Sequence, residues 1–169
     1  MRDDSERWDA ADPNGYVHAA NGITLVPAAV SRQTLLSGSR VLTQTEQSIA
    51  SWPDIVADES YALSIRRDRV LLVNGPAVAE GWHEDSCQAV SDASDAYAVL
   101  DMSGEKSLEV LKRGAELNLN IPSKSTARIV FGLGVFLYRY DAENRFRIHV
   151  ASGYAEALVI SLKGAIAAA

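Results

Sequence analysis

The sequence predicts an α+β domain in which an antiparallel sheet carries helices packed on one side. Three observations lead to this class. Short segments of apolar and β-branched residues, bounded by Gly, Pro, Asn or Asp, recur along the chain and are typical of antiparallel strands. Residues 103–114 and 152–166 instead repeat apolar side chains at helical spacing. The length of 169 residues, with 47% hydrophobic and 22% charged residues, fits one domain of ordinary size.

The first half of the chain contains four predicted strands. In residues 61–66 large apolar side chains occupy every second position, and Arg67-Asp68 follows as a tight turn. Residues 43–51 suit either a short helix or a loop, and residues 77–85 are predicted to form a short helix. The predicted strands of this half are 23–26, 33–36, 61–66 and 70–73.

A predicted strand over 96–102 leads directly into a helix with marked ends. Ser103 is placed as its N-cap, and Glu105 lies in the first turn, where the helix dipole favours an anion. Lys112-Arg113-Gly114 supplies cations for the last turn and a glycine for the position after the helix.

The last third predicts three further strands and a terminal helix. Gly132-Leu133-Gly134 separates strands at 127–131 and 135–140, and a third strand follows at 146–150. On this third strand Phe146, Ile148 and Val150 share the apolar face. Arg145, Arg147 and His149 share the other face, which we expect to meet solvent or an interface.

Ser152 is placed as the N-cap of the terminal helix. The predicted apolar stripe of this helix is Tyr154, Leu158, Leu162 and Ile166.

Composition excludes several classes of function. The 22 acidic and 16 basic residues give a formal charge of −6 without a basic block, so we expect no nucleic-acid partner. Cys87 is the one cysteine, which excludes an internal disulfide and a structural zinc site with several cysteines, and points to the cytoplasm. No apolar run approaches the roughly 20 residues of a membrane span, so no membrane partner is expected.

Residues 1–21 are predicted to form an N-terminal tail, and residues 22–169 a single domain. The tail is rich in Asp, Asn and Gly and lacks a hydrophobic period, yet it contains Trp8 and Tyr16. Large aromatic side chains outside a core pattern are typical anchors of an interface. Trp8 and Tyr16 are therefore the candidate partner contacts.

Several motifs occur in an order found in one protein family. The run from Val90 to Gly104, VSDASDAYAVLDMSG, resembles the D-x-S-x-A…L-x-x-S-G stretch of the gamma subunits of heterotetrameric sarcosine oxidase. The run from Val110 to Leu119 is similar to their V-L-x-K-G-x-x-L-D-L. The hairpin at 134–140, the strand at 146–150 and the closing helix continue the resemblance, which extends from about Gly22 to the end.

This resemblance implies a domain related to the folate-binding domain of the glycine-cleavage aminomethyltransferase. It also implies a structural subunit whose partners are two larger subunits that hold the flavins, the nicotinamide dinucleotide (NAD) and tetrahydrofolate. Two positions depart from the family pattern. Ala115 replaces a cysteine that often follows the helix glycine, and Asn118 replaces the aspartate of Leu-Asp-Leu.

The related folate enzymes depend on an aspartate in a G-G-V-x-D-D context, and this chain has Gly134-Val135-Phe136-Leu137-Tyr138 instead. The resemblance therefore implies the fold without the carboxylate that handles the proton. Gly132-Leu133-Gly134 has two of the three glycines of a dinucleotide turn and leads into a strand, which favours a hairpin.

The remaining polar groups have ordinary interpretations that outweigh functional ones. Gly81 to Cys87 contains His83, Glu84 and Asp85 but lacks a second cluster to complete a metal shell. Other groups are assigned to solvated turns or isolated positions: Arg66, Arg67 and Arg69, which could bind an anion; Asp92 and Asp95; and His18.

The sequence therefore predicts no catalytic, cofactor-binding or metal residue in this chain. The leading hypothesis is a non-catalytic accessory subunit, which requires only folding and contact. The alternative is a free-standing tetrahydrofolate-binding module. The third hypothesis, an independent small enzyme, ranks last because no nucleophile, base and orienting group occur as a set.

Overall fold

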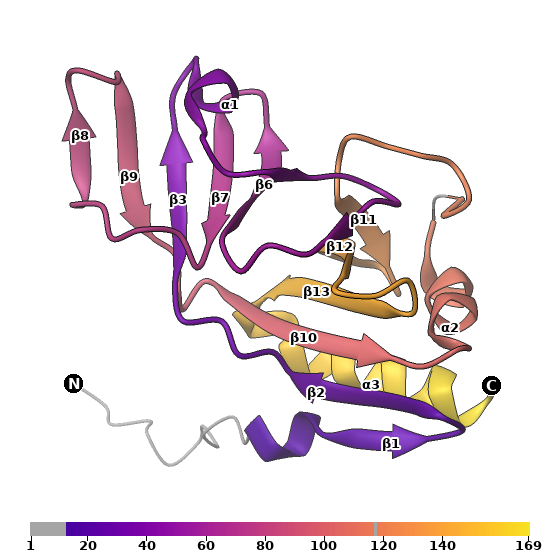
Figure 1. Cartoon of the computed structure of the whole chain (residues 1–169). Helices are drawn as coiled ribbons and strands as arrows, with labels where there is room; N and C mark the ends of the chain where they lie inside the picture. The colour runs from indigo at the N-terminus through magenta and orange to yellow at the C-terminus, as the bar shows by residue number, and fades with distance from the viewer. Residues whose placement is uncertain (1–12, 117) are drawn as a thin grey trace, which may run out of the picture.

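The computed structural model describes residues 13–116 and 118–169 and contains two β-sheets (Figure 1). The first sheet has the order β1 (His18–Ala20), β2 (Ile23–Pro27), β10 (Tyr97–Ser103), β13 (Arg145–Ala151), β12 (Leu133–Tyr140), β11 (Ala127–Val130). The second has the order β4 (Ile49–Ala50), β6 (Tyr61–Arg66), β7 (Arg69–Val73), β3 (Gln33–Ser37), β9 (Gln88–Asp92), β8 (Gly81–His83). The mixed class of strands and a few helices is confirmed, but the strands form two sheets where the sequence predicted one.

The pairing is antiparallel except at two short strands. β5 (Ile55–Val56) runs parallel to β12, and β4 runs parallel to β6. Figure 1 shows the second sheet standing upright at the left, while β2 and β10 run across the front of the molecule.

Helices α2 (Ser107–Gly114) and α3 (Ala155–Ala167) pack on one face of the first sheet, as predicted. The short α1 (Val41–Gln44) packs against the second sheet, and two 3-10 turns, η2 (Pro13–Tyr16) and η3 (Ser152–Tyr154), complete the chain. The core between the helices and the first sheet includes fully buried side chains from both, such as Leu100, Phe146, Ile148, Leu111, Leu158 and Leu162.

Strand β12 contributes to two cores because its side chains alternate between faces. Val135 and Leu137 join the core beneath the helices, whereas Phe136 and Tyr138 pack with residues of the second sheet. The second sheet therefore covers the face of the first that lies away from α2 and α3.

The predicted helix over 77–85 is wrong. Strand β8 occupies Gly81–His83 and pairs with β9 through the register Trp82↔Ala89. Gly81 has φ +114°, outside the helical region, and pairing with β9 overrides the helix propensity of the alanines in this segment. Of the two alternatives for residues 43–51, the structure has α1 ending at Gln44 and the short strand β4 at 49–50.

The predicted caps of the two main helices are also wrong. Ser103 is the last residue of β10, and α2 begins at Ser107 without a side-chain cap. Ser152 lies in η3, where its Oγ donates to the Asp95 carbonyl oxygen at 2.6 Å. Gly114 is still helical, and its missing Cβ makes room for the Phe131 ring, which would lie 2.6 Å from that atom.

The terminal stripe is confirmed at Leu158, Leu162 and Ile166, which are fully buried. Tyr154 does not belong to it, because its side chain is 59% exposed. The stripe is completed by Ala155 and Val159, one helical turn apart.

Residues 13–20 belong to the folded domain and not to a tail. Strand β1 pairs with β2 through three residue pairs, and Lys163 Nζ of α3 donates to the Gly15 carbonyl oxygen at 2.6 Å. The predicted boundary at residue 21 therefore lies too far along the chain. Within the described ranges, no helix has the length and apolar content needed to cross a membrane.

Candidate functional site

The candidate site is a buried polar cluster between the two sheets. It begins on β13, where Arg147 and His149 alternate with the apolar residues that face the helices. The expectation that these two residues meet solvent or an interface is wrong: Arg147 is 4% exposed and His149 is fully buried. The second sheet covers this face, so the polar half of the alternating strand faces a second interior.

Asp101 on β10 anchors one end of the cluster. It lies directly across from Arg147 in the β10–β13 ladder. Arg147 donates from Nε to Oδ1 at 2.7 Å and from Nη2 to Oδ2 at 3.0 Å, and Arg145 donates to Oδ2 at 2.9 Å. Burial by itself would raise the pKa of Asp101, but its hydrogen bonds to Arg147 and Arg145 and their charges hold that pKa below its ordinary value.

From Arg147 the hydrogen bonds continue through three side chains. Arg147 Nη1 donates to Tyr61 Oη at 3.1 Å, and the Tyr61 and Tyr138 hydroxyl oxygens lie 2.6 Å apart. Tyr138 Oη lies 2.7 Å from His149 Nε2. The face of Tyr140 covers the Arg147 guanidinium at 3.6 Å, which adds a cation–π contact.

This series of hydrogen bonds ends at Gln33 on β3. His149 Nδ1 lies 2.8 Å from Gln33 Oε1, and Gln33 Nε2 donates to the carbonyl oxygens of Tyr97 at 2.9 Å and Ser94 at 3.2 Å. Gln33 Oε1 can only accept, so His149 Nδ1 carries the proton. Burial, assisted by the charge of Arg147, lowers the pKa of His149 to about 3. His149 is therefore neutral near pH 7, and its Nε2 accepts from Tyr138.

These assignments give every hydrogen bond of the series one donor and one acceptor. Because Tyr138 donates to His149, it must accept from Tyr61, which in turn accepts from Arg147. Burial raises the pKa of both Tyr61 and Tyr138 above the ordinary value, so both phenols keep their protons. The cluster connects β10, β12 and β13 of the first sheet to β3 and β6 of the second.

This arrangement can hold two sheets in register but supplies no reactive group. The Asp101 carboxylate is bound by two guanidiniums, and the imidazole of His149 is bound at both nitrogens. A general base or nucleophile needs a free lone pair within reach of a substrate. The cluster is therefore structural in its chemistry.

The other polar residues considered from the sequence lie outside this cluster. His83 Nε2 bonds the Ala79 carbonyl oxygen at 2.7 Å, and Cys87 is exposed. No three His, Cys, Asp or Glu side chains in the described parts of the chain are grouped to hold a metal ion. Asp92 Oδ1 accepts from the backbone N and Oγ of Ser94, and these hydrogen bonds lower the pKa of Asp92, as expected of turn chemistry.

The remaining candidates lie at the edges of the fold. Arg66, Arg67 and Arg69 are exposed around the β6–β7 turn. Tyr16 is half-buried against the core beneath the helices, so it packs on its own domain. Trp8 lies outside the described residues.

After Gly134, strand β12 continues with the apolar and aromatic side chains of Val135, Phe136 and Leu137. A hollow of about 420 Å³ opens near the start of this strand, with the rings of Tyr97 and Phe136 among its walls. Neither a carboxylate nor a histidine lines this hollow. Arg128 is the charged residue of its lining, so the hollow offers apolar contact and a guanidinium group.

Sequence reasoning missed Asp101, Tyr61, Tyr138 and Gln33 as members of one cluster. A signal was available for Asp101, because a carboxylate between Leu100 and Met102 in a buried strand requires a cation beside it. Arg145 and Arg147 are the cations that meet this requirement. No local pattern connects Gln33 to His149, which is 116 residues away.

Comparison with known proteins finds similarity among solved structures. No protein-family model and no curated protein sequence matches the chain. Among solved structures, a chain of the heterotetrameric sarcosine oxidase from Corynebacterium sp. U-96, determined in complex with pyrrole 2-carboxylate, has a similar fold with a TM-score of 0.67. The match is 19% identical and covers 92% of this chain and 89% of that chain. The two chains therefore share a fold over almost their full lengths.

Proposed function

We propose that this chain is a non-catalytic accessory subunit of the gamma type in a heteromeric sarcosine oxidase, or in a related complex that oxidises N-methyl amino acids. The observation that carries the proposal is the fold shared with a chain of a heterotetrameric sarcosine oxidase over 92% of this chain. The ordered motifs from Val90 to the terminal helix support it independently.

The interior of the fold supports a subunit without chemistry of its own. The space between the sheets is filled by buried apolar side chains and by the paired groups of the polar cluster. In this proposal the flavins, NAD and tetrahydrofolate are bound by the larger partner subunits, which carry out the oxidation in the cytoplasm.

Co-expression tests the proposal directly. A tagged form of this chain is produced together with the large flavin and folate subunits that the proposal requires, and is recovered through its tag. We expect the large subunits to co-purify in fixed stoichiometry. We also expect the chain alone to be colourless and inactive with sarcosine. Flavin absorbance or peroxide release by the repurified chain alone would overturn the proposal.

Calorimetric titration with tetrahydrofolate separates the proposal from a free-standing folate module. We expect binding no tighter than millimolar, which corresponds to about 4 kcal/mol of binding free energy. Micromolar binding without capture of a large subunit would favour the folate module instead.

A further inference from the structure

The outermost hairpin of the second sheet exposes a tryptophan. The side chain of Trp82 on β8 is 58% exposed, and Val78, four residues earlier, is 39% exposed. Tryptophan is usually well buried in a folded chain and is enriched at the centres of protein interfaces. Its exposure on an edge strand therefore needs a reason beyond the stability of the isolated chain.

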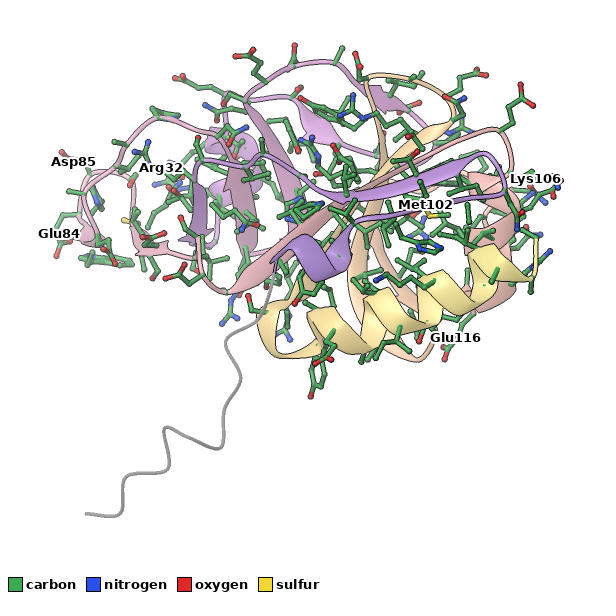
Figure 2. The ribbon with its side chains drawn as sticks, turned by 90° about the horizontal axis from the view of Figure 1, so that it is seen from below. Arg32, Glu84, Asp85, Met102, Lys106 and Glu116 are labelled. Carbon is green, nitrogen blue, oxygen red and sulfur yellow. The ribbon has the colours of Figure 1, made fainter. Side chains whose placement is uncertain are left out.

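The charged side chains of the same hairpin are all negative. No lysine or arginine occurs between Arg69 and Lys106, whereas Glu80, Glu84 and Asp85 flank Trp82 on both sides. Glu84 and Asp85 are exposed, and Figure 2 shows them together at one end of the molecule, opposite the end marked by Lys106. A partner that covers Trp82 must therefore place cations beside these carboxylates.

The hairpin is held in a defined position. β8 pairs with β9, which pairs in turn with β3 at the centre of the sheet. The His83 ring bonds the Ala79 carbonyl oxygen, and Gln88 donates to Gln44 of α1 at 2.6 Å. A side chain presented on a fixed backbone loses little conformational entropy when it binds.

Protection of a sheet edge accounts for only part of these observations. Charged residues and a short strand discourage edge-to-edge aggregation, and β8 is short and flanked by Glu80 and Glu84. A large exposed indole works against such protection, because it adds an apolar surface to the edge. The indole and the carboxylates together match one ligand chemistry, the guanidinium group, which stacks on an aromatic face and pairs with carboxylates.

We propose that the Trp82 hairpin, residues 78–87, docks against an arginine-bearing surface of the larger partner subunit, with Trp82 as its anchor. This inference rests on the proposed function and adds to it the surface and the chemistry of the contact. It places the interface at the second sheet, away from α2 and α3.

The test uses the co-expressed complex with the large subunits and matched variants of the full chain. Trp82→Ala removes the anchor, and Tyr154→Ala removes an aromatic side chain of nearly equal exposure, 59%, from η3. We expect Trp82→Ala to weaken capture of the large subunit at least tenfold, and Tyr154→Ala to change it less than twofold. Thermal unfolding of each isolated variant verifies that the fold is intact.

A second pair of variants tests the charge. Glu84→Gln with Asp85→Asn removes two carboxylates from the hairpin, and Glu105→Gln with Glu143→Gln removes two exposed carboxylates elsewhere. We expect only the first pair to weaken capture and to reduce its sensitivity to salt.

The outcomes separate the two proposals. If the wild-type chain captures the large subunit and Trp82→Ala captures it equally well, the docking surface is wrong and the proposed function stands. Equal losses from Trp82→Ala and Tyr154→Ala also reject the surface. If the wild-type chain captures no large subunit, both proposals fall.

Discussion

At the scale of single residues, the polar cluster shows why a strand with an ordinary alternating pattern can be buried on both faces. Arg147 and Asp101 face each other across the β10–β13 ladder, and each satisfies the other after both have left water. Such a pair stabilises less than its distance implies, because desolvation offsets the attraction. Removal of one partner is much more costly, because the other charge then stays buried alone.

Asp101→Asn tests this asymmetry. We expect a loss of about 3 kcal/mol in the free energy of unfolding, because Arg147 keeps its charge without a counter-ion. Asp141→Asn is the matched control, because Asp141 also pairs with Arg145 but its side chain is 66% exposed, so a loss below about 1 kcal/mol is expected. Urea unfolding of both variants at pH 7 gives the comparison, and equal losses would contradict the role of Asp101.

His149 gives a prediction for pH. Its pKa is about 3 in the fold and about 6.5 when unfolded, so between these values the unfolded chain binds a proton that the folded chain does not. Stability should therefore fall as the pH drops below about 6.5, by up to about 1.4 kcal/mol per pH unit from this residue. The lowered pKa of Asp101 acts in the same direction, but only below the ordinary carboxyl range near 4.

The measurement compares urea unfolding at pH 7, 6 and 5 for the wild-type chain and His149→Gln. The variant cannot take up this proton. In the lower part of this pH range, the slope of its free energy of unfolding against pH should therefore be smaller, by an amount that corresponds to about one proton. A slope unchanged by the substitution would show that His149 does not titrate on unfolding in this way.

At the scale of elements, turns are fixed by backbone geometry as much as by side chains. Residues 131–132 form the two-residue turn between β11 and β12, with φ values of 51° and 77°. The sequence predicted this hairpin from its glycines but placed the turn at 132–134, whereas Leu133 and Gly134 belong to β12. Gly104 is more demanding: its φ is +136°, and a Cβ there would overlap the Gly22 carbonyl oxygen and lie 3.0 Å from Ile23 Cα.

Gly104→Ala should therefore cost about 2 kcal/mol or more, because the β2 backbone cannot move away from the new methyl group without disturbing the β2–β10 ladder. Gly153→Ala is the control, since a methyl group added there would have no atom within 4 Å and the φ of Gly153 is not positive. That change should stay within about 1 kcal/mol of the wild type. Thermal and urea unfolding measure the stability of the two variants. A Gly104→Ala variant more stable than Gly153→Ala would contradict the argument.

The elements also show how far sequence patterns reach. Strands with strict alternation or continuous apolar runs, such as β6, β7 and β13, were predicted within a residue or two. The segment 77–85 failed because its strand character comes from pairing with β9 and not from its own composition. The division into two sheets was not predictable, because alternation on β13 does not reveal whether its polar face meets water or a second buried layer.

At the scale of the whole molecule, we expect different roles for Tyr16 and Trp8. Tyr16 packs on the core beneath the helices, whereas Trp8 stays a candidate partner contact. We expect Trp8→Ala to weaken capture of the large subunit without changing the thermal unfolding midpoint. Tyr16→Ala should lower the midpoint, because it removes a half-buried ring from the core. A lower midpoint in Trp8→Ala, with capture unchanged, would contradict the assignment of Trp8.

The order of the strands determines how late in translation the fold of this chain can be completed. The polypeptide passes from the first sheet to the second and back twice, contributing residues 18–27, 33–50, 55–56, 61–92 and 97–151 in turn. β13, the last strand to be made, lies in the middle of the first sheet, between β10 and β12. Until residue 151 has left the ribosome, β10 and β12 have no common neighbour and the apolar sides of both sheets stay open. We therefore expect the chain to complete both sheets, and the surfaces they present, only after translation of β13.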